Sequence, residues 1–171
     1  MIRSSMQLKA LVRNMAQGDS TKAQIIRRHY VMGRFLERVS LSPYRANLVL
    51  KGGALIAAMV GLERRSTLDL DATIQNWPLS LDEAQAMVLE IASVPLDDGV
   101  HFDITDVSTI MDESDYAGGR IMLDTTLETT HTPFRIDFST GDILTPKEIE
   151  FSYPLLFEDR SVPILAYNLE T

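Results

Sequence analysis

Two aspartates close together in the sequence could hold a metal ion. Asp69 and Asp71 alternate with Leu68 and Leu70. In a β-strand, residues two apart point to the same face and lie roughly 7 Å apart along the backbone. The alternation therefore predicts a strand with one acidic face and one face anchored in the core. Carboxylate oxygens are the ligands that magnesium prefers, so this strand is a candidate metal site.

A glycine pair precedes the acidic strand. Gly52 and Gly53 lie between a predicted strand, Asn47–Leu50, and a predicted helix, Ala54–Val60. Glycine lets a backbone approach a ligand closely, and a helix N-terminus presents free N–H groups, so this junction suits a phosphate. Taken alone, a glycine pair is more often a turn, and an Asp-x-Asp strand is more often a solvated face. Their order and spacing together predict a site for a nucleoside triphosphate and a metal.

The segment resembles the nucleotidyltransferases of the DNA polymerase beta superfamily, and within them the abortive-infection toxin family AbiEii. The resemblance rests on the glycine and aspartate pairs together with Lys51 before the glycines and Arg65 and Thr67 before the carboxylates. It covers most of the chain from about Leu48 onward. Further short strings follow in the family's order: Tyr116–Arg120, Pro133–Phe138, Gly141–Asp142, Tyr153–Leu156 and Ile164–Thr171.

The resemblance implies roles for individual residues. Phosphate contacts fall to Lys51, Gly52, Gly53, Arg65 and Thr67, and the metal ligands are Asp69, Asp71 and Asp137. Ser66 has no histidine partner in the motif, so its hydroxyl is expected to contact phosphate or cap the turn rather than act as a nucleophile.

The third carboxylate of the family pattern lies on a strand beside the Asp-x-Asp strand. Asp137 fits that place, because Ile136 and Phe138 are expected to face the core and Asp137 the opposite side. Three clustered carboxylates repel one another unless a cation neutralises them. Asp142 is the alternative, although Gly141 before it favours a turn.

The family's activity is the transfer of a nucleoside monophosphate from a triphosphate to an acceptor hydroxyl. By resemblance, this chain is expected to be an enzyme that uses Mg²⁺ or Mn²⁺. The implied acceptor is RNA, most simply the 3′ end of a tRNA, and the implied context is a bacterial toxin–antitoxin system with a cognate antitoxin as a possible partner. The expected compartment is the cytoplasm, without a membrane partner.

Two departures from the family pattern give an alternative. Leu68 stands where many relatives carry a basic residue, and the sequence stops at Thr171, before an Ala-Glu-Lys motif and a helical domain. A lysine that relatives use near the phosphates is therefore missing. The chain is expected to be the nucleotide-binding half of a larger enzyme or a short copy of it, and to transfer nucleotides slowly or not at all. The alternative function is a catalytically impaired module that binds a nucleotide or a protein.

Composition favours one globular domain. The chain has 171 residues, of which 45% are hydrophobic and 23% charged, and no cysteine, which excludes disulfides and thiolate metal sites. The N-terminus lacks the apolar run of a signal peptide, and no stretch is long enough to cross a bilayer. Residues 1–65 carry 12 basic against 3 acidic side chains, whereas residues 66–171 carry 4 against 21. Either the two parts attract each other in the fold, or the basic part faces an anionic ligand.

The predicted fold is α+β, a nucleotidyltransferase-like mixed or antiparallel sheet covered on one side. A single domain, residues 1–171, comprises a helical part, 1–45, and a sheet core, 46–171. The first expected helix is Ser5–Ala16. The second is capped by Asp19 or Ser20 and ends at Ser42–Pro43. The third is capped by Ser80 and follows a turn at Trp77–Pro78. Expected strands are Val100–Ile110, Gly119–Glu128 and Thr132–Phe138, with Gly118–Gly119 in a turn.

Other polar groups are given structural interpretations. Arg27, Arg34 and Arg38 form a stripe on the second helix that is expected to be solvated, with an RNA-facing stripe as the alternative. The three histidines lack metal-ligand spacing and are expected in the core or on the surface. The acidic run 112–115 lacks the spacing of a calcium loop and is expected to be a solvated loop.

Overall fold

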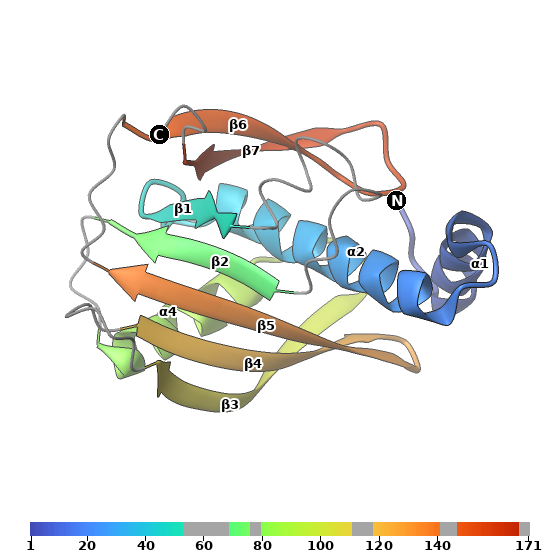
Figure 1. Cartoon of the computed structure of the whole chain (residues 1–171), viewed down its shortest axis with the longest axis horizontal. Coiled ribbons are helices and arrows are strands. Elements are labelled where there is room, and N and C mark those ends of the chain that lie inside the picture. The colour runs from blue at the N-terminus through green and yellow to red at the C-terminus, as the bar shows by residue number, and fades with distance from the viewer. Residues whose placement is uncertain (53–68, 76–79, 111–117, 141–146, 168–171) are drawn as a thin grey trace.

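The structure, a computed structural model, describes residues 1–52, 69–75, 80–110, 118–140 and 147–167. Within these ranges the helices are α1 (Ser5–Ala16), α2 (Ser20–Leu41) and α4 (Leu81–Ala92). The strands are β1 (Leu48–Lys51), β2 (Asp69–Ile74), β3 (Val100–Ile110), β4 (Gly118–Leu127), β5 (Thr130–Thr140), β6 (Ile149–Pro154) and β7 (Ser161–Ala166). They form one mixed sheet in the order β3-β4-β5-β2-β1-β7-β6 (Figure 1). The β2–β5 and β1–β7 pairs are parallel, and the α+β class is confirmed.

Side-chain caps begin the helices where the sequence predicts them. The Asp19 carboxylate accepts a hydrogen bond from the backbone N–H of Thr21 at 3.0 Å, and the Ser80 hydroxyl accepts one from Glu83 at 3.1 Å. Each bond satisfies an N–H group that has no partner within its own helix. Gly18, with a φ of 85°, makes the turn from α1 into α2. The predicted bounds of α1 and the predicted start of α4 are therefore confirmed.

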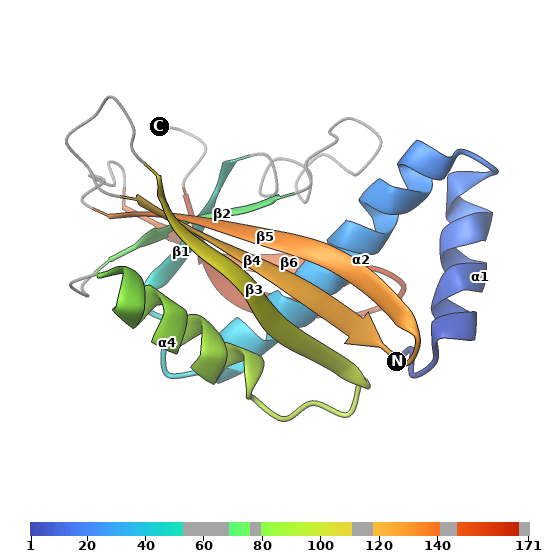
Figure 2. The same ribbon diagram turned by 90° about the horizontal axis from the view of Figure 1, so that it is seen from below.

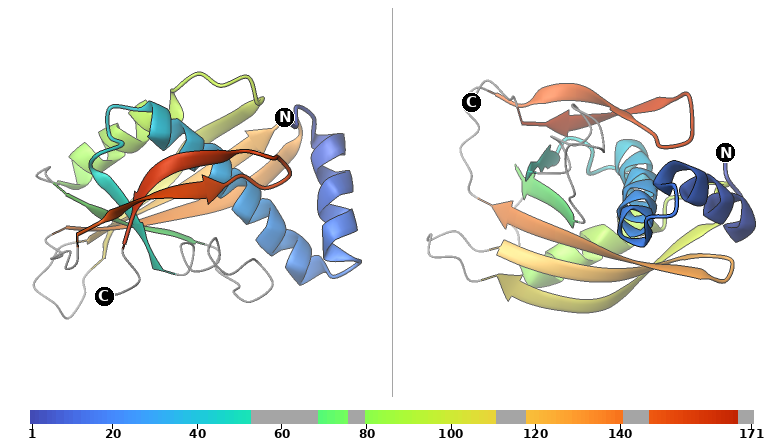
Figure 3. Two further views of the ribbon diagram at one scale, coloured as in Figure 1. Left: turned by 90° about the horizontal axis from the view of Figure 1, so that it is seen from above. Right: turned by 45° about the vertical axis from the view of Figure 1, so that its right-hand side comes forward.

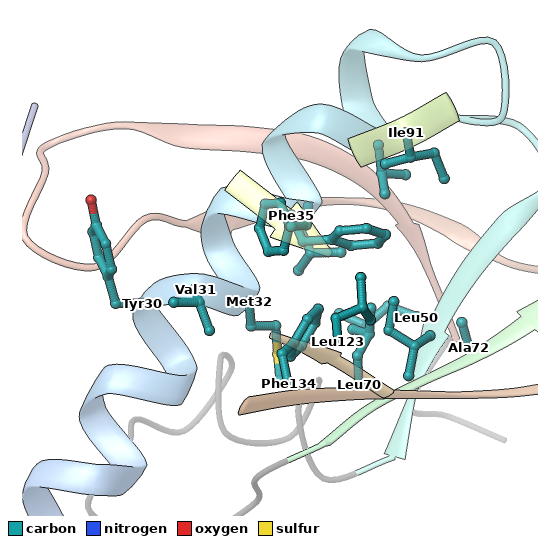
Figure 4. Packing of buried hydrophobic residues seen from close by; sticks show 14 of the residues in the cluster. Tyr30, Val31, Met32, Phe35, Leu50, Leu70, Ala72, Ile91, Leu123 and Phe134 are labelled. Atoms are coloured by element: carbon teal, nitrogen blue, oxygen red, sulfur yellow. The ribbon is translucent and has the colours of Figure 1, made fainter. Parts of the chain in front are cut away.

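One face of the sheet carries the hydrophobic core. Figure 1 shows α2 and α4 on the same side of the sheet, where α2 packs on β5 and β7 and α4 on β3 and β4, which confirms the prediction that helices cover one side. Phe35 of α2 and Ile91 of α4 pack over Leu50, Leu70 and Phe134 of the sheet, and all five are almost fully buried (Figure 4). Burying one such side chain contributes about 1.5–3 kcal/mol, so this packing fixes the helices to the sheet. No helix in the described ranges has the length and apolarity needed to span a membrane.

One prediction about the sheet is wrong, and two strands were missed. Gly118 and Gly119 belong to β4, where they pair with Ile110 and Thr109 of β3, and are not a turn. A Cβ atom at Gly118 would lie 2.7 Å from the Phe138 carbonyl oxygen, so glycine is required there by a close backbone approach. Strands β6 and β7 were not predicted at all. Pro154 ends β6 and Pro163 lies within β7, and proline weakens the strand signal of any sequence segment.

The prediction of a solvated arginine stripe on α2 is also wrong. Arg34 and Arg38 are only 1% and 2% exposed, whereas Arg27 is partly exposed. The Arg38 guanidinium donates to both oxygens of the fully buried Asp98, at 2.8 and 2.9 Å, and to the Val100 carbonyl at 3.1 Å. The segment between α4 and β3 therefore covers this part of α2 and supplies the partner of its charge.

A second part of this ionic network ties α2 to the β6–β7 hairpin, which crosses over the helix (Figure 3). Arg160 donates to both oxygens of Glu37, at 2.8 and 3.1 Å. Arg34 lies 2.9 Å from Glu37 and 3.1 Å from Glu158. The Arg34–Glu158 pair, like Arg38–Asp98, joins a basic side chain of residues 1–65 to an acidic one of residues 66–171, as one interpretation of the charge division predicts, whereas Arg160–Glu37 has the opposite arrangement.

The histidines fit their structural interpretation. His29 is buried in α2, and His101 is exposed on β3. His131 is exposed on β5, and its Nδ1 lies 2.7 Å from Asp124. The described residues therefore place one histidine in the core and two on the surface.

Replacing Arg38 with alanine should destabilise the protein by about 3–5 kcal/mol, because it leaves the Asp98 carboxylate buried without its main partner. Arg45→Ala is the matched control, since Arg45 forms an exposed ion pair with Glu150 and its loss should cost about 1 kcal/mol or less. Urea unfolding followed by circular dichroism measures both. Equal losses in the two variants would show that the buried network does not hold α2 in place.

Candidate active site

A row of four charged side chains crosses the sheet on the face opposite the helices. Lys51 of β1 is the register partner of Asp71 of β2. Asp71 is in turn the register partner of Asp137 of β5, and Asp137 is the register partner of Arg120 of β4. Register partners on adjacent strands share a face and lie about 5 Å apart, so the two carboxylates stand side by side with a cation at each end. The preceding or following residues on these strands are buried in the core: Leu50, Leu70, Ile136 and Ile121.

A second pair of charges lies next to this row on the same face. Asp69 is the register partner of Arg135, and the Arg135 guanidinium forms an ion pair with the Asp69 carboxylate. The prediction that Asp69 and Asp71 share a face with Asp137 therefore agrees with the strand register. The structure brings these three predicted residues onto neighbouring strands, although they are far apart in the sequence.

Two arginines of this site were missed by the sequence analysis. Arg120 donates to both oxygens of Asp137, at 2.9 and 3.3 Å, and the Arg135 Nε lies 3.9 Å from the same carboxylate. Arg135 stands two residues before Asp137, so the alternation that paired Asp69 with Asp71 could have identified it. Arg120 could not be found in this way, because only the β4–β5 register brings it to Asp137.

Burial and nearby negative charge together raise the pKa of the Asp71 carboxyl above its ordinary value. Partial burial is the largest cause, followed by repulsion from Asp137 and Asp69. Lys51 and Arg135 act in the opposite direction but do not outweigh these effects. A cation beside Asp71 would relieve the repulsion.

Gly52 makes room for the Asp71 carboxylate. Its φ is 74°, in the left-handed region that favours glycine, and a Cβ atom there would lie 2.5 Å from the Asp71 Oδ2. The chain therefore leaves β1 with its backbone directly against this carboxylate. A glycine is therefore required at position 52 by the backbone conformation and by the nearby Asp71 carboxylate, in addition to its predicted contact with phosphate.

Hydroxyl groups lie at the Lys51 end of the row. The Lys51 Nζ donates to the Ser139 hydroxyl, and its ammonium lies 6.0 Å from the centre of the Tyr167 ring. The Tyr167 hydroxyl is 2.7 Å from that of Thr73. These polar residues were not predicted, because Thr73 and Ser139 read as ordinary strand residues. They fix the position of Lys51 beside the carboxylates.

Several predicted site residues lie outside the described ranges. These are Gly53, Arg65, Ser66, Thr67 and the alternative carboxylate Asp142. The predicted helix 54–60, the turn 77–78 and the acidic run 112–115 also fall there. Their assignments stay predictions.

The donor chemistry of the site suits a divalent cation. Asp69, Asp71 and Asp137 offer only oxygen ligands, and the absence of a side chain at Gly52 leaves room for the Asp71 carboxylate. Within the part of the chain that the structure describes, no three acidic or histidine side chains converge in a geometry that holds a metal. Asp69 and Asp137 each accept a hydrogen bond from an arginine instead. A metal at these three residues would have to compete with Arg120 and Arg135.

Comparison with known proteins identifies the family. The sequence model described as nucleotidyl transferase AbiEii toxin, type IV toxin–antitoxin system, matches residues 34–171. No match to a curated protein was found. A crystal structure of a proposed nucleotidyltransferase from Helicobacter pylori has a TM-score of 0.51 and 17% identity, covering 86% of this chain and 55% of that one. JHP933 from the same species has a TM-score of 0.50 and 20% identity, with coverages of 86% and 53%.

These structural similarities establish the fold alone, because the identities are low. The chain spans little more than half the length of the two solved structures that it matches. The family assignment rests on the match over residues 34–171, which includes every described residue of the charged row.

Replacing Gly52 with alanine should displace the Asp71 carboxylate and lower its pKa toward the ordinary value, because the displaced group regains water. Gly18→Ala is the matched control: its φ is 85°, but a Cβ atom there meets nothing within 4 Å. Both variants should lose about 1 kcal/mol from backbone strain. Carbon-13 NMR titration of the Asp71 carboxyl group measures the difference, and an unchanged Asp71 pKa in Gly52→Ala would contradict the contact.

Asp71→Asn should make the protein more stable at pH 7. A carboxyl whose pKa is raised in the folded state contributes stability below its unfolded pKa and loses that contribution as the pH rises through the folded pKa. Asparagine cannot ionise, so at pH 7 the variant does not suffer the loss of stability that ionisation of Asp71 causes in the parent. The difference in stability between the two proteins should shrink as the pH is lowered. Urea unfolding at several pH values tests this, with the exposed Asp159→Asn as control. A less stable Asp71→Asn protein at pH 7 would contradict the electrostatic account.

Proposed function

Since this chain belongs to the AbiEii family of nucleotidyl transferase toxins, we propose that it transfers a nucleoside monophosphate from a nucleoside triphosphate to an acceptor hydroxyl. The observation that carries the proposal is the register of β2 and β5, which sets Asp71 beside Asp137 on a sheet face with Asp69 next to them. The acceptor oxygen would bond to the α-phosphorus while the bond from that phosphorus to the bridging oxygen breaks. Pyrophosphate is the leaving group.

The three aspartates are the proposed ligands of Mg²⁺ or Mn²⁺. A divalent cation bound there supplies positive charge to the transferred phosphoryl group and its leaving oxygen. Asp137 is the proposed acceptor of the proton that leaves the attacking hydroxyl, because it lies on β5 between Asp71 of β2 and Arg120 of β4. Its charge would then be neutralised in the same step in which the acceptor gains a bond to phosphorus.

Lys51 and Gly52 are the proposed phosphate contacts within the described ranges. Lys51 is the cation at the β1 end of the row, and Gly52 exposes its backbone beside Asp71. Gly53, Arg65, Ser66 and Thr67 complete this set by resemblance to the family. A triphosphate would lie across the row, with its negative charges between Lys51 and the metal ligands.

The acceptor that we propose is RNA, with the 3′ end of a tRNA as the specific candidate. Helix α1 and the first turns of α2 project beyond the sheet (Figure 2). Lys9, Arg13 and Arg27 line a cavity of about 300 Å³ between these helices, and no ion pair joins them to a carboxylate in the described part of the chain. Such cations can contact an RNA backbone. A cognate antitoxin and a cytoplasmic location belong to the same proposal, since both are general features of such systems.

The alternative function is a module that binds a nucleotide or a protein without transfer. The two possibilities differ in one observable result. A binding module retains the triphosphate unchanged, whereas a transferase leaves a labelled acceptor.

Incubation of the chain with α-labelled triphosphates, Mg²⁺ or Mn²⁺ and total tRNA should label the RNA at a slow but measurable rate. Asp71→Asn and Asp137→Asn should each reduce the labelling rate by about a hundredfold or more, because each removes a charged group that acts on the transition state. Asp159→Asn is the exposed control and should label at the parental rate. Nucleotide binding without any labelling would establish the alternative function, and full activity of Asp71→Asn would show that the site assignment is wrong.

A further inference from the structure

Arg120 and Arg135 lie where two kinds of partner compete for them. Their guanidinium groups contact the carboxylates of Asp137 and Asp69, on the same sheet face as Lys51. Both arginine side chains are partly exposed, at 37% and 33%, so they can also reach a ligand that lies over the sheet. The contacts with aspartate are therefore accessible and not locked inside the core.

Arg135 has donor capacity that its aspartate does not use. Its Nε is buried and has no hydrogen-bond acceptor among the described residues, although the Asp137 Oδ1 lies 3.9 Å away. A buried N–H group without an acceptor is costly, and a phosphate oxygen would satisfy it. Arg120 presents a planar fork that already makes two parallel contacts with one carboxylate, which is also the geometry that matches phosphate.

A divalent cation and a guanidinium group compete for the same carboxylate oxygens. Both carry positive charge, and both require the lone pairs of Asp69 and Asp137. A triphosphate offers the arginines a larger negative charge close to the place that they leave. Partner exchange therefore keeps every charge in the site compensated.

We propose that Arg120 and Arg135 are triphosphate-binding residues that exchange their aspartate partners for phosphate oxygens when a metal and a triphosphate bind. This inference rests on the proposed function. It adds two phosphate-binding cations, on β4 and β5, to Lys51 on β1. Lys51 then binds the triphosphate from one side of the carboxylates and the two arginines from the other.

The test measures two affinities in the same variants. Binding of Mn²⁺ alone is followed by electron paramagnetic resonance of the free ion, and binding of inorganic tripolyphosphate with saturating Mn²⁺ is followed by calorimetry. In Arg120→Gln and Arg135→Gln, Mn²⁺ should bind about two- to fivefold more tightly, because a partly exposed competitor for the carboxylates is gone. Tripolyphosphate should bind about tenfold or more weakly, because a charge-assisted contact is lost.

The opposite signs distinguish this role from a structural one. Arg45→Gln, at an exposed ion pair before β1, should change neither affinity, and Arg120→Lys should recover part of the tripolyphosphate affinity because it restores the charge but not the fork. Parallel loss of both affinities, or no change in either, would overturn the exchange. If the parent protein binds no tripolyphosphate, the proposed function fails with it, whereas equal binding by the parent and both variants defeats the exchange alone.

Discussion

Repulsion between Asp71 and Asp137 is the constraint around which the charged face of the sheet is built. The two carboxylates are register partners on parallel strands, and their proximity contributes to the raised pKa of Asp71. Lys51 and Arg120 flank the pair in the same row, and Gly52 supplies the space that a larger residue would take from Asp71. Parallel strands need a crossover connection, and α4, β3 and β4 lie between β2 and β5 in the sequence. The sheet order thus produces an arrangement that costs stability and is suited to binding cations.

The sequence predicted those parts of the site that depend on local alternation. Asp69 and Asp71 share a strand face, and Asp137 points away from the core because its two neighbours are buried. The contribution of Arg120 depends on register between β4 and β5, which no local pattern contains. Helix caps such as Asp19 were predictable because they too depend on local sequence. The Asp19 carboxylate accepts from the backbone N–H of Thr21, only two residues further along the chain.

The basic residues of the first helices have two different environments, and charge counting could not separate them. Arg38 is buried because its partner Asp98, 60 residues later, is also buried. Helical periodicity treats an arginine as a solvent-facing residue, so it cannot reveal such a partner. Lys9 and Arg13, by contrast, line an open cavity between α1 and α2. The division of charge along the chain therefore reflects both attraction within the fold and a basic surface.

The parallel pairing of β1 with β7 has a consequence for the order in which the protein can assemble during synthesis. Val49 and Leu50 of β1 pair with Leu165 and Ala166, among the last described residues, and the Tyr167 N–H donates to the Leu50 carbonyl at 3.0 Å. A nascent chain on the ribosome can form the helices early, because their contacts are local. The strand that carries Lys51 acquires its second neighbour only after residue 166 has left the ribosome. The basic end of the charged row is consequently completed only once β7 is available to pair with β1, when the carboxylates of β2 and β5 are already available to each other.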